Sequence, residues 1–468
     1  MDLKRKRFGL DFGMAAKNPS RSYFLSGIGG SGMLPLAHIL AGQGCRVLGS
    51  DRSRDQGRTP EKFENLEKSG FILFPQDGSG VAGVDALVVS AAIEDTVPDV
   101  KAAKDAGIPI IRRAELLAQL FNAVDTRIAV GGTSGKTTTT GMIAFILKEA
   151  GLDPTVMCGG VMKNYGTTAL TGRGGIFVTE SDESDGSISL YQPDIAVLTN
   201  ISVDHKGMDE LRDLFTAFVG KARHPVINAD NAEAAALANA KTITYGLDAG
   251  VYTAKDVFHL EEGVSAVVTN GMEKSAISLE VLGAHNLSNA LAAIAAAGAC
   301  GVKLKDAAYS LGRFAGIKRR LEFVGEEQGI TVIDDFAHNP DKIAATLSTL
   351  KQFDGRLLVI FQMHGYGPLK LMWQELADTF RTLTDENDRI FMPDPLYLGG
   401  TVDRSIGTKE VCAAIGPRAQ WCESRTYAGE AALAMARPGD RIVVMGARDD
   451  TLSDFAQSLL SALQKGKQ

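Results

Sequence analysis

The sequence lacks several features that mark specialised classes of protein. No stretch approaches the roughly 18 uninterrupted apolar residues that a membrane-spanning helix needs. The five cysteines are scattered and include no C-x-x-C pair, which argues against a disulfide framework or a zinc site and fits a reducing compartment. The formal net charge is −7, so nothing indicates a nucleic-acid partner. The basic N-terminus has no signal-peptide core, because Asp11 and Lys17 interrupt it.

What the sequence does contain is typical of a globular chain. Hydrophobic residues make up 45% and charged residues 22% of the 468 positions. At roughly 150 residues per domain, this length predicts about three domains. We expect a flexible arm followed by three α/β domains, at residues 1–20, 21–124, 125–317 and 318–468.

The first of these segments alternates short apolar runs with a helical pattern. Strands are expected at 22–28, 45–51 and 85–93, with a helix at 33–44. Such alternation predicts a parallel sheet with crossover helices.

A glycine pattern lies between the first strand and its helix. It reads Gly27-x-Gly29-x-x-Gly32, and Asp51 ends the second strand 19 residues after Gly32. This spacing is typical of a dinucleotide-binding turn, in which glycines let the backbone approach a pyrophosphate and the acid holds a ribose hydroxyl. The alternative interpretation is a tight strand-to-helix turn without a ligand.

The second segment carries GGTSGKTTTTGM from Gly131, between a strand expected at 126–132 and a helix at 136–151. The usual phosphate loop, G-x-x-x-x-G-K-[ST], would need a glycine at Val130, so this loop is shortened. Four consecutive threonines are poor helix formers, which favours a functional reason for at least one. We expect the Thr137 hydroxyl on Mg²⁺, Lys136 on the β/γ-phosphates, and the backbone amides from Gly132 to Lys136 as further donors.

Acidic and imidazole groups are expected beside this loop. Glu180 ends one apolar strand, and Asp204 and His205 are expected to end another. An acid and an imidazole there would hold a second metal ion. The alternatives are a solvated acidic turn for residues 181–185 and an ordinary polar role for His205.

The third segment, from Lys318, predicts two strands joined by a charged turn and then a helix entered through Asn339 and Pro340. Further buried strands are expected at 356–362, 389–395 and 440–450. These elements form another small α/β unit.

Taken together, these motifs resemble those of the Mur ligases, which build the peptide of the bacterial cell wall. The likeness covers nearly the whole chain after residue 20. The motifs that carry it, in family order, are GIGGSGM at 27–33, SAAI at 90–93, RAELLAQL at 113–120, GGTSGKTTTT at 131–140, ESDESD at 180–185, TNISVDH at 199–205, GAHNLSNALAA at 283–293, KRRLE at 318–322 and DDFAHNPD at 334–341.

The resemblance implies a Rossmann-like UDP-binding domain, a central domain of the phosphate-loop ATPase type and a Rossmann-like C-terminal domain that receives the amino acid. It implies an ATP-dependent ligase that uses Mg²⁺ (or Mn²⁺) and joins the carboxylate of UDP-N-acetylmuramate to an amino acid through an acyl phosphate, in peptidoglycan biosynthesis. The partners would be a UDP-sugar and an amino acid or peptide, with no nucleic acid and no membrane. A monomer or weak homodimer in the bacterial cytoplasm is expected.

The family's functional residues carry over by position. The residues that would act in the reaction are Lys136, His205 and Arg320. By the resemblance, ATP would be bound by Gly132, Thr133, Ser134, Gly135, Lys136, Thr137, Thr138, His285, Asn286, Asn289, Arg320 and Asp335. Of these, His285, Asn286 and Asn289 would meet the adenine, Arg320 would reach the terminal phosphate and Asp335 would hold the ribose. The UDP-sugar would be bound by Gly27, Gly29, Gly30, Gly32, Met33, Asp51, Ser90 and Ala91. The amino acid would be contacted by Phe336, His338, His364 and Lys370. The metal ligands would be Thr137 and Glu180 for the first ion and His205 for the second.

The chemistry explains these residue types. A carboxylate is a poor electrophile, so ATP first converts it to an acyl phosphate, which an amine then attacks. Bringing two anions together requires Mg²⁺ and cations such as Lys136 and Arg320. Domain closure would assemble the site and exclude water that hydrolyses the intermediate.

Three departures from the alanine-adding members affect the prediction of the amine. Ser134 stands where they usually have His, and D-F-A-H-N-P at 335–340 replaces D-Y-G-H-H-P. The stretch 361–370 has no arginine, although the family uses one there to grip the amino acid's carboxylate. Gly365 to Pro368 suggests a tight, weakly charged loop, and Lys370 offers only a point charge. L-alanine is favoured, and the alternative is the L-Ala-γ-D-Glu-meso-diaminopimelate tripeptide of cell-wall recycling.

Two readings from other classes compete with a ligase. A nicotinamide-dependent dehydrogenase would use Gly27, Gly29, Gly32 and Asp51, but it gives the phosphate loop no task. A non-catalytic nucleotide-binding protein would not need a second-metal histidine or Arg320. Other Mur ligases carboxylate a lysine; Lys221 lies near that region but out of register, so no role is assigned to it.

Overall fold

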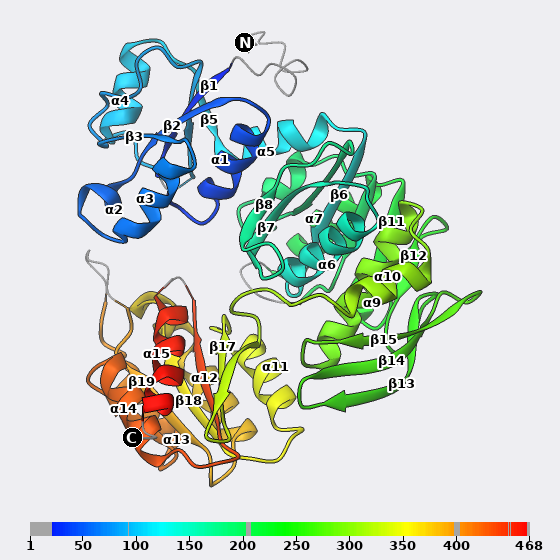
Figure 1. Cartoon of the computed structure of the whole chain (residues 1–468), viewed down its shortest axis with the longest axis vertical. Helices are drawn as coiled ribbons and strands as arrows, with labels where there is room; N and C mark the ends of the chain where they lie inside the picture. The colour runs from blue at the N-terminus through cyan, green and yellow to red at the C-terminus, as the bar shows by residue number, and fades with distance from the viewer. Residues whose placement is uncertain are drawn as a thin grey trace. The chain divides into compact units, whose positions relative to one another are not determined.

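The computed structural model describes residues 21–91, 93–202, 207–396, 403–447, 449 and 451–465. They divide into two compact units, each considered by itself (Figure 1). The first comprises the described residues up to Asp256 with Ala266–Ile277 and Leu287–Phe314. The second comprises Val257–Ser265, Ser278–Asn286 and the described residues from Ala315 onward. Within the described residues, no helix is both long and apolar enough to cross a membrane.

The first sheet of the first unit is parallel, in the order β3-β2-β1-β4-β5. Its strands are β1 Ser22–Ser26, β2 Arg46–Ser50, β3 Ile72–Phe74, β4 Ala86–Val89 and β5 Ile110–Arg112, and its helices are α1 Met33–Gly42, α2 Arg52–Asp55, α3 Pro60–Lys68, α4 Pro98–Asp105 and α5 Arg113–Asn122. Side chains alternate across β1: Tyr23 and Leu25 join the core cluster of α1, whereas Phe24 joins that of Val100 in α4. Helices therefore cover both faces, as the alternating sequence predicts.

A second sheet in this unit has the order β12-β11-β10-β6-β9-β7-β8. Its strands are β6 Thr126–Gly131, β7 Thr155–Met162, β8 Thr167–Leu170, β9 Ile176–Glu180, β10 Ile195–Leu198, β11 His224–Asn228 and β12 Ile243–Tyr245. Within this sheet of the described residues, the edge strand β8 pairs with β7 in antiparallel orientation, and the other neighbouring strands pair in parallel. The central position of β6 places the loop that follows it in the middle of the sheet's carboxyl edge.

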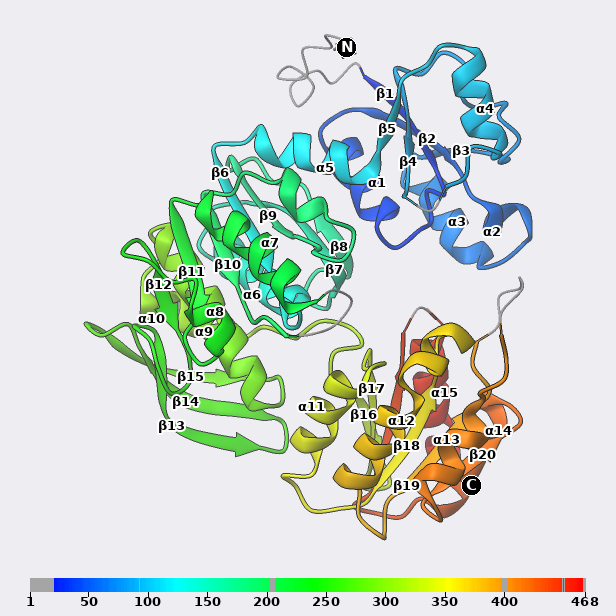
Figure 2. The same ribbon diagram turned by 180° about the vertical axis from the view of Figure 1, so that it is seen from behind.

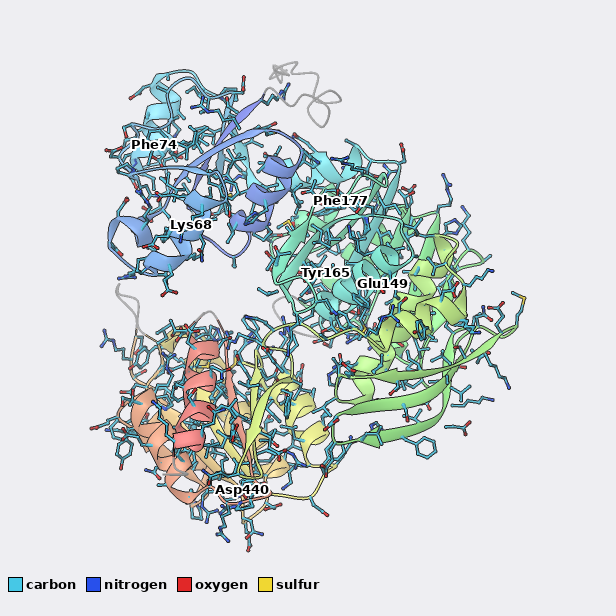
Figure 3. The ribbon with its side chains drawn as sticks, in the orientation of Figure 1. Lys68, Phe74, Glu149, Tyr165, Phe177 and Asp440 are labelled. Atoms are coloured by element: carbon cyan, nitrogen blue, oxygen red, sulfur yellow. The ribbon has the colours of Figure 1, made fainter. Side chains whose placement is uncertain are left out.

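The helices of this second sheet are α6 Lys136–Glu149, α7 Met208–Gly220, α8 Ala232–Ala235, α9 Ala284–Ala299 and α10 Leu304–Leu311, with a 3₁₀ turn at Ser187–Leu190 (Figure 2). Every residue of α6 from Thr137 to Leu147 is buried, so this helix belongs to the core rather than the surface. Phe177 in β9, labelled in Figure 3, contributes to the sheet's other layer and lies edge to face against Phe121, with ring centroids 5.7 Å apart.

A separate small sheet has the order β13-β14-β15, with strands β13 Thr253–Leu260, β14 Gly263–Thr269 and β15 Lys274–Leu279 (Figure 1). The sequence reading did not anticipate it. Its strands contain several charged residues and lack the uniform apolar runs of the parallel strands.

The sheet of the second unit has the order β16-β17-β21-β18-β19-β20, with β16 antiparallel and the other pairings parallel (Figure 2). Its strands are β16 Glu322–Glu327, β17 Ile330–Asp335, β18 Leu357–Gln362, β19 Arg389–Pro393, β20 Ala419–Cys422 and β21 Arg441–Gly446, and its helices are α11 Pro340–Leu350, α12 Tyr366–Leu383, α13 Thr408–Ile415, α14 Arg425–Met435 and α15 Leu452–Lys465. Ile333 and Val359 pack with α11 to α13, whereas Val332 and Leu358 pack with α14 and α15. Because successive side chains of a strand point to opposite faces, these apolar strands supply core residues to both faces of the sheet.

The predicted α/β fold class is confirmed, and so is the start of α11. Pro340 takes its first position, and the Asn339 side chain accepts a hydrogen bond from the Lys342 amide at 3.0 Å. The boundaries expected after residues 124 and 317 stay predictions.

Two local expectations were wrong. The expected loop at Gly365–Pro368 is the start of α12, which begins at Tyr366; a proline fits there because the first amides of a helix have no partner within it. The strand expected to run up to Asp204 and His205 is shorter than predicted, because β10 ends at Leu198; those two residues themselves lie outside the described part of the chain.

One buried carboxylate ties the carboxyl ends of β1 and β2 to α4. Asp99 is 0% exposed and accepts hydrogen bonds from the Ser26 hydroxyl at 2.8 Å, the Ser50 hydroxyl at 2.5 Å and the Gly78 amide at 3.1 Å. This link holds the edge of the sheet from which the glycine turn Gly27–Gly32 emerges.

We expect Asp99→Ala to lower the free energy of unfolding by about 2–4 kcal/mol, because two buried hydroxyls and a partly buried amide lose their acceptor. Urea denaturation measures this change. Asp105→Ala on the same helix, where the carboxylate is exposed, serves as the control and should stay close to wild type. Equal stability of the two variants would show that Asp99 does not anchor this edge.

Candidate active site

The phosphate loop is the turn between β6 and α6. Gly132 and Gly135 have φ of 128° and 85°, backbone angles that residues other than glycine rarely adopt. A methyl group at Gly135 would also lie 2.6 Å from the Asn289 side-chain oxygen. Gly135 caps α6, whose first amides have no acceptor within the helix and so form a site suited to phosphate.

Residues that follow β10 hold this loop in place. The Thr133 amide donates to the Asn200 carbonyl and the Ser134 amide to the Asn200 side-chain oxygen, both at 3.0 Å. The Thr199 hydroxyl lies 2.6 Å from the Ser134 carbonyl oxygen. Two of the amides expected to face phosphate are therefore engaged within the protein. The other candidate donors are the amides of Gly132 and Gly135 and those of the first turn of α6.

Lys136 is placed across the loop by two acceptors. Its Nζ lies 2.5 Å from the Gly132 carbonyl oxygen and 2.8 Å and 3.1 Å from the two carboxylate oxygens of Glu183. Glu183 is 6% exposed, so this is a largely buried ion pair. The sequence analysis assigned no role to Glu183 and offered a solvated acidic turn only as an alternative for residues 181–185. Residues 181–185 are all polar, so the sequence carried no signal for Glu183; only the structure shows that Ser181 and Glu183 are buried and Asp182 is exposed.

The two expected first-metal ligands are brought together. The Thr137 hydroxyl donates to a Glu180 carboxylate oxygen at 3.0 Å, at the end of β9. A hydroxyl and a carboxylate, completed by phosphate oxygens, are the hard oxygen ligands that Mg²⁺ takes. Among the described residues, no group of three or more acidic, histidine or cysteine side chains could hold a metal ion. His205 lies outside them, so its role as second-metal ligand stays a prediction.

A glycine in β7 makes room for this carboxylate. A Cβ atom on Gly159 would lie 2.1 Å from a Glu180 carboxylate oxygen. Such an approach is not tolerated, so either Glu180 or the strand would have to move.

We therefore expect Gly159→Ala to displace Glu180 and to raise the Mg²⁺ concentration for half-maximal activity about tenfold, which corresponds to roughly 1.4 kcal/mol in metal affinity. A Mg²⁺ titration of ATP-dependent phosphate release measures it. Gly220→Ala, where an added Cβ meets nothing within 4 Å, is the matched control. Coincident titration curves for the two variants would remove Glu180 from the metal site.

The α9 residues assigned to adenine lie in two settings. Asn289 accepts a hydrogen bond from the Thr139 hydroxyl at 3.2 Å, so in the first unit it supports the phosphate loop. In the second unit, the His285 ring lies against Gly283, where an added Cβ would be 2.6 Å from it. The Asn286 amide group donates to the Leu282 carbonyl at 2.8 Å.

In the first sheet, Asp51 folds the glycine turn. One carboxylate oxygen accepts from the Gly29 amide at 2.9 Å and the other from the Ser53 amide at 2.8 Å. The carboxylate is buried, so the acid expected to hold a ribose already shapes the turn. An added Cβ at Gly32 would lie 3.3 Å from the Arg113 guanidinium, a cation at this turn that the sequence reading did not assign.

The other UDP-sugar candidates adjoin the same edge. Gly27 has φ of 79°, and its carbonyl accepts from the Gly30 amide at 3.0 Å. Met33 is buried at the start of α1. Ser90 and Ala91 directly follow β4, the neighbour of β1. These residues therefore line the switch point of the sheet, where ligands of such folds bind.

In the second unit, Arg320 stands between two residues with left-handed backbone, Arg319 with φ of 60° and Leu321 with φ of 46°. Asp335 accepts from the Leu321 amide at 3.2 Å and from the Thr346 hydroxyl. The carboxylate expected to hold ribose is thus buried and fixes the arginine-bearing turn. Strain of this kind is typical of functional turns.

The guanidinium of Arg320 lies over the Phe336 ring, 4.8 Å from its centroid. Arg319 is 5.2 Å from the same ring but donates to the Gly446 carbonyl at 2.7 Å and to Asp334 at 3.2 Å. Phe336, expected to contact the amino acid, therefore serves as a support for both arginines.

Two histidines expected to contact the amino acid form a ring cluster with Phe336. Ring centroids of Phe336 and His338 are 5.4 Å apart, and those of His338 and His364 are 5.2 Å apart. His338 Nδ1 lies 2.8 Å from the Phe336 carbonyl oxygen; since that oxygen can only accept, Nδ1 carries the proton and Nε2 the lone pair. Burial, with Lys342 nearby, lowers the pKa of His338 to about 4, so the ring is neutral at pH 7.

Lys370 and Lys221, the other two lysines considered from the sequence, both contact acceptors of the protein. Lys370, on α12, forms an ion pair with Asp403. Lys221 Nζ donates to the Ser189 carbonyl at 2.7 Å and the Tyr191 carbonyl at 3.1 Å. Neither contact indicates carboxylation of Lys221.

A glycine loop at a central parallel strand, a lysine crossing it and a hydroxyl–carboxylate pair beside it define a nucleotide-dependent enzyme of the phosphate-loop class. Family models match three successive stretches: "Mur ligase family, catalytic domain" at 24–124, "Mur ligase middle domain" at 130–297 and "Mur ligase, glutamate ligase domain" at 319–448. The chain belongs to the Mur ligase family, as its motifs suggested.

Relatives at the level of sequence include a UDP-N-acetylmuramate–L-alanine ligase from Geotalea daltonii, 36% identical over 90% of this chain and 94% of that protein. Among solved structures, UDP-N-acetylmuramate-alanine ligase from Thermotoga maritima has a TM-score of 0.78 at 26% identity, covering 95% of this chain and 99% of that one. A murein peptide ligase from Psychrobacter arcticus has a TM-score of 0.69 at 26% identity, with coverage of 95% and 99%.

Proposed function

We propose that this protein is an ATP-dependent ligase that joins the carboxylate of UDP-N-acetylmuramate to L-alanine through an acyl phosphate, in bacterial peptidoglycan synthesis. The observation that carries the proposal is the Lys136 loop with the Thr137–Glu180 pair beside it. Relatives at 34% to 38% identity are named UDP-N-acetylmuramate–L-alanine ligase, which supports the choice of both substrates. The bacterial cytoplasm, and a monomer or weak homodimer, are part of the same proposal.

The residues divide the work of phosphoryl transfer between them. Bound ATP supplies the terminal phosphoryl group, and Mg²⁺ (or Mn²⁺) neutralises its charge. Thr137 and Glu180 would hold the metal ion, and the first-turn amides of α6 would bind phosphate oxygens. Lys136 lowers the repulsion between the carboxylate of the sugar and the phosphates. Arg320 remains assigned to the terminal phosphate by its place in the family motif.

A second candidate amine is the tripeptide L-Ala-γ-D-Glu-meso-diaminopimelate. One observation favours it: the 361–370 stretch has no arginine, and its lysine, Lys370, is paired with Asp403. A bidentate grip on an amino acid's carboxylate is therefore not built from this stretch. The murein peptide ligase from Psychrobacter arcticus, whose name indicates a peptide substrate, has a similar fold.

Lys136→Ala should lower ATP-dependent phosphate release with UDP-N-acetylmuramate and L-alanine by a factor of at least about 10², as removal of one electrostatic stabiliser typically does. The fold should persist, because α6 is held by its buried apolar residues. Circular dichroism and thermal unfolding provide the control. A folded variant with near-normal release would show that this loop is not the site.

For the amine, we expect kcat/KM with L-alanine to exceed that with glycine, L-serine and the tripeptide, using the same UDP-sugar in each reaction. The measurement is product formation at subsaturating amine concentrations. A preference for the tripeptide of more than about tenfold, or roughly 1.4 kcal/mol in transition-state binding, would reassign the enzyme to peptide recycling.

A further inference from the structure

The contacts of Lys136 with Glu183 and with the Gly132 carbonyl use all the hydrogen-bonding capacity of the lysine. An ammonium group has three donors. They face three acceptors at 2.5 Å, 2.8 Å and 3.1 Å: the Gly132 carbonyl and the two oxygens of Glu183. For Lys136 to donate to a phosphate, at least one of these contacts must be given up.

The pair is also shielded from solvent. The side chains of Lys136 and Glu183 are 16% and 8% exposed. Charges in such a position are little screened by salt, and removing one partner leaves the other buried without compensation. The attraction between them therefore competes directly with any other anion that approaches Lys136.

Neighbouring carboxylates do not share this position. Asp182 and Asp185 are exposed and accept from the backbone amides of Ser184 and Ser187, both at 2.9 Å. They shape the turn after β9. Glu183, buried between them, reaches the phosphate loop instead.

We propose that Glu183 is a positioning residue that holds Lys136 across the loop and yields it to the β/γ-phosphates of the nucleotide. The inference rests on the proposed function, which assigns ATP to this loop. Nucleotide binding then exchanges one anion for another at Lys136, and Glu183 sets the affinity of that exchange.

A consequence concerns the metal ion. Once Lys136 turns to phosphate, the Glu183 carboxylate stays buried close to another anion. That arrangement is unfavourable until a divalent cation adds positive charge. The carboxylate thus makes nucleotide binding depend more strongly on Mg²⁺ than the phosphate loop alone would require.

The test is to measure Kd for AMP, ADP and ATP, with EDTA and with Mg²⁺, on the full chain and on Glu183→Gln. The amide is isosteric and keeps one acceptor oxygen, but it carries no negative charge to compete with phosphate for Lys136. With EDTA we expect ADP and ATP to bind about fivefold more tightly or better, and AMP, which lacks the β- and γ-phosphates, to be unchanged. The gain in affinity from Mg²⁺ should be smaller than in the wild type.

Asp182→Asn is the matched control, because it removes the same charge from the same turn without contact to Lys136; its Kd values should equal those of the wild type. If Glu183→Gln does not fold, Glu183→Asp replaces it: the charge stays, but the shorter side chain no longer reaches Lys136. The same change is expected, with a lower Kd for ADP than in the wild type and an unchanged Kd for AMP. Unchanged or weaker ADP binding, or equal tightening of AMP, would overturn the inference. A wild-type protein that binds no ATP even with Mg²⁺ would overturn the proposed function as well.

Discussion

The left-handed turn between β6 and α6 is the constraint on which the candidate site depends. It requires glycine at positions 132 and 135, and it places the first amides of a helix that is buried from Thr137 to Leu147 at the centre of the sheet's carboxyl edge. Asn200 and Thr199, from the end of the neighbouring strand β10, fix the loop through its backbone. The helix cannot shift without breaking the core, so the amides proposed to bind phosphate are held by the packing of the domain.

Carboxylates around the candidate sites also serve the fold. Asp51 closes the glycine turn, and Asp335 fixes the turn that carries Arg320. Glu180 meets Thr137, and Glu183 meets Lys136. In each case the acid is bonded to the groups that would surround a ligand, so ligand binding would rearrange existing hydrogen bonds rather than fill an unorganised space. Affinity then reflects the difference between two sets of contacts.

Much of the fold could be read from the sequence, because its parallel strands are short apolar runs followed by turn residues and helices. Lys136, Thr137 and Glu180 could be proposed because each has a fixed place relative to a strand end. Glu183, Asn200 and Gly159 could not, since their roles arise from tertiary contacts between distant segments. The start of α12 was missed because Gly365 and Pro368 suggest a turn, although a proline is compatible with a helix's first turn.

The central claim is that ATP activates the sugar's carboxylate before the amine attacks it. The most direct measurement uses UDP-N-acetylmuramate labelled with ¹⁸O in its carboxylate and follows the label during turnover with L-alanine. Cleavage of an acyl phosphate by the amine leaves one carboxylate oxygen on the phosphate that departs. The account therefore predicts one ¹⁸O in each released phosphate, and amide product formed together with unlabelled phosphate would contradict it.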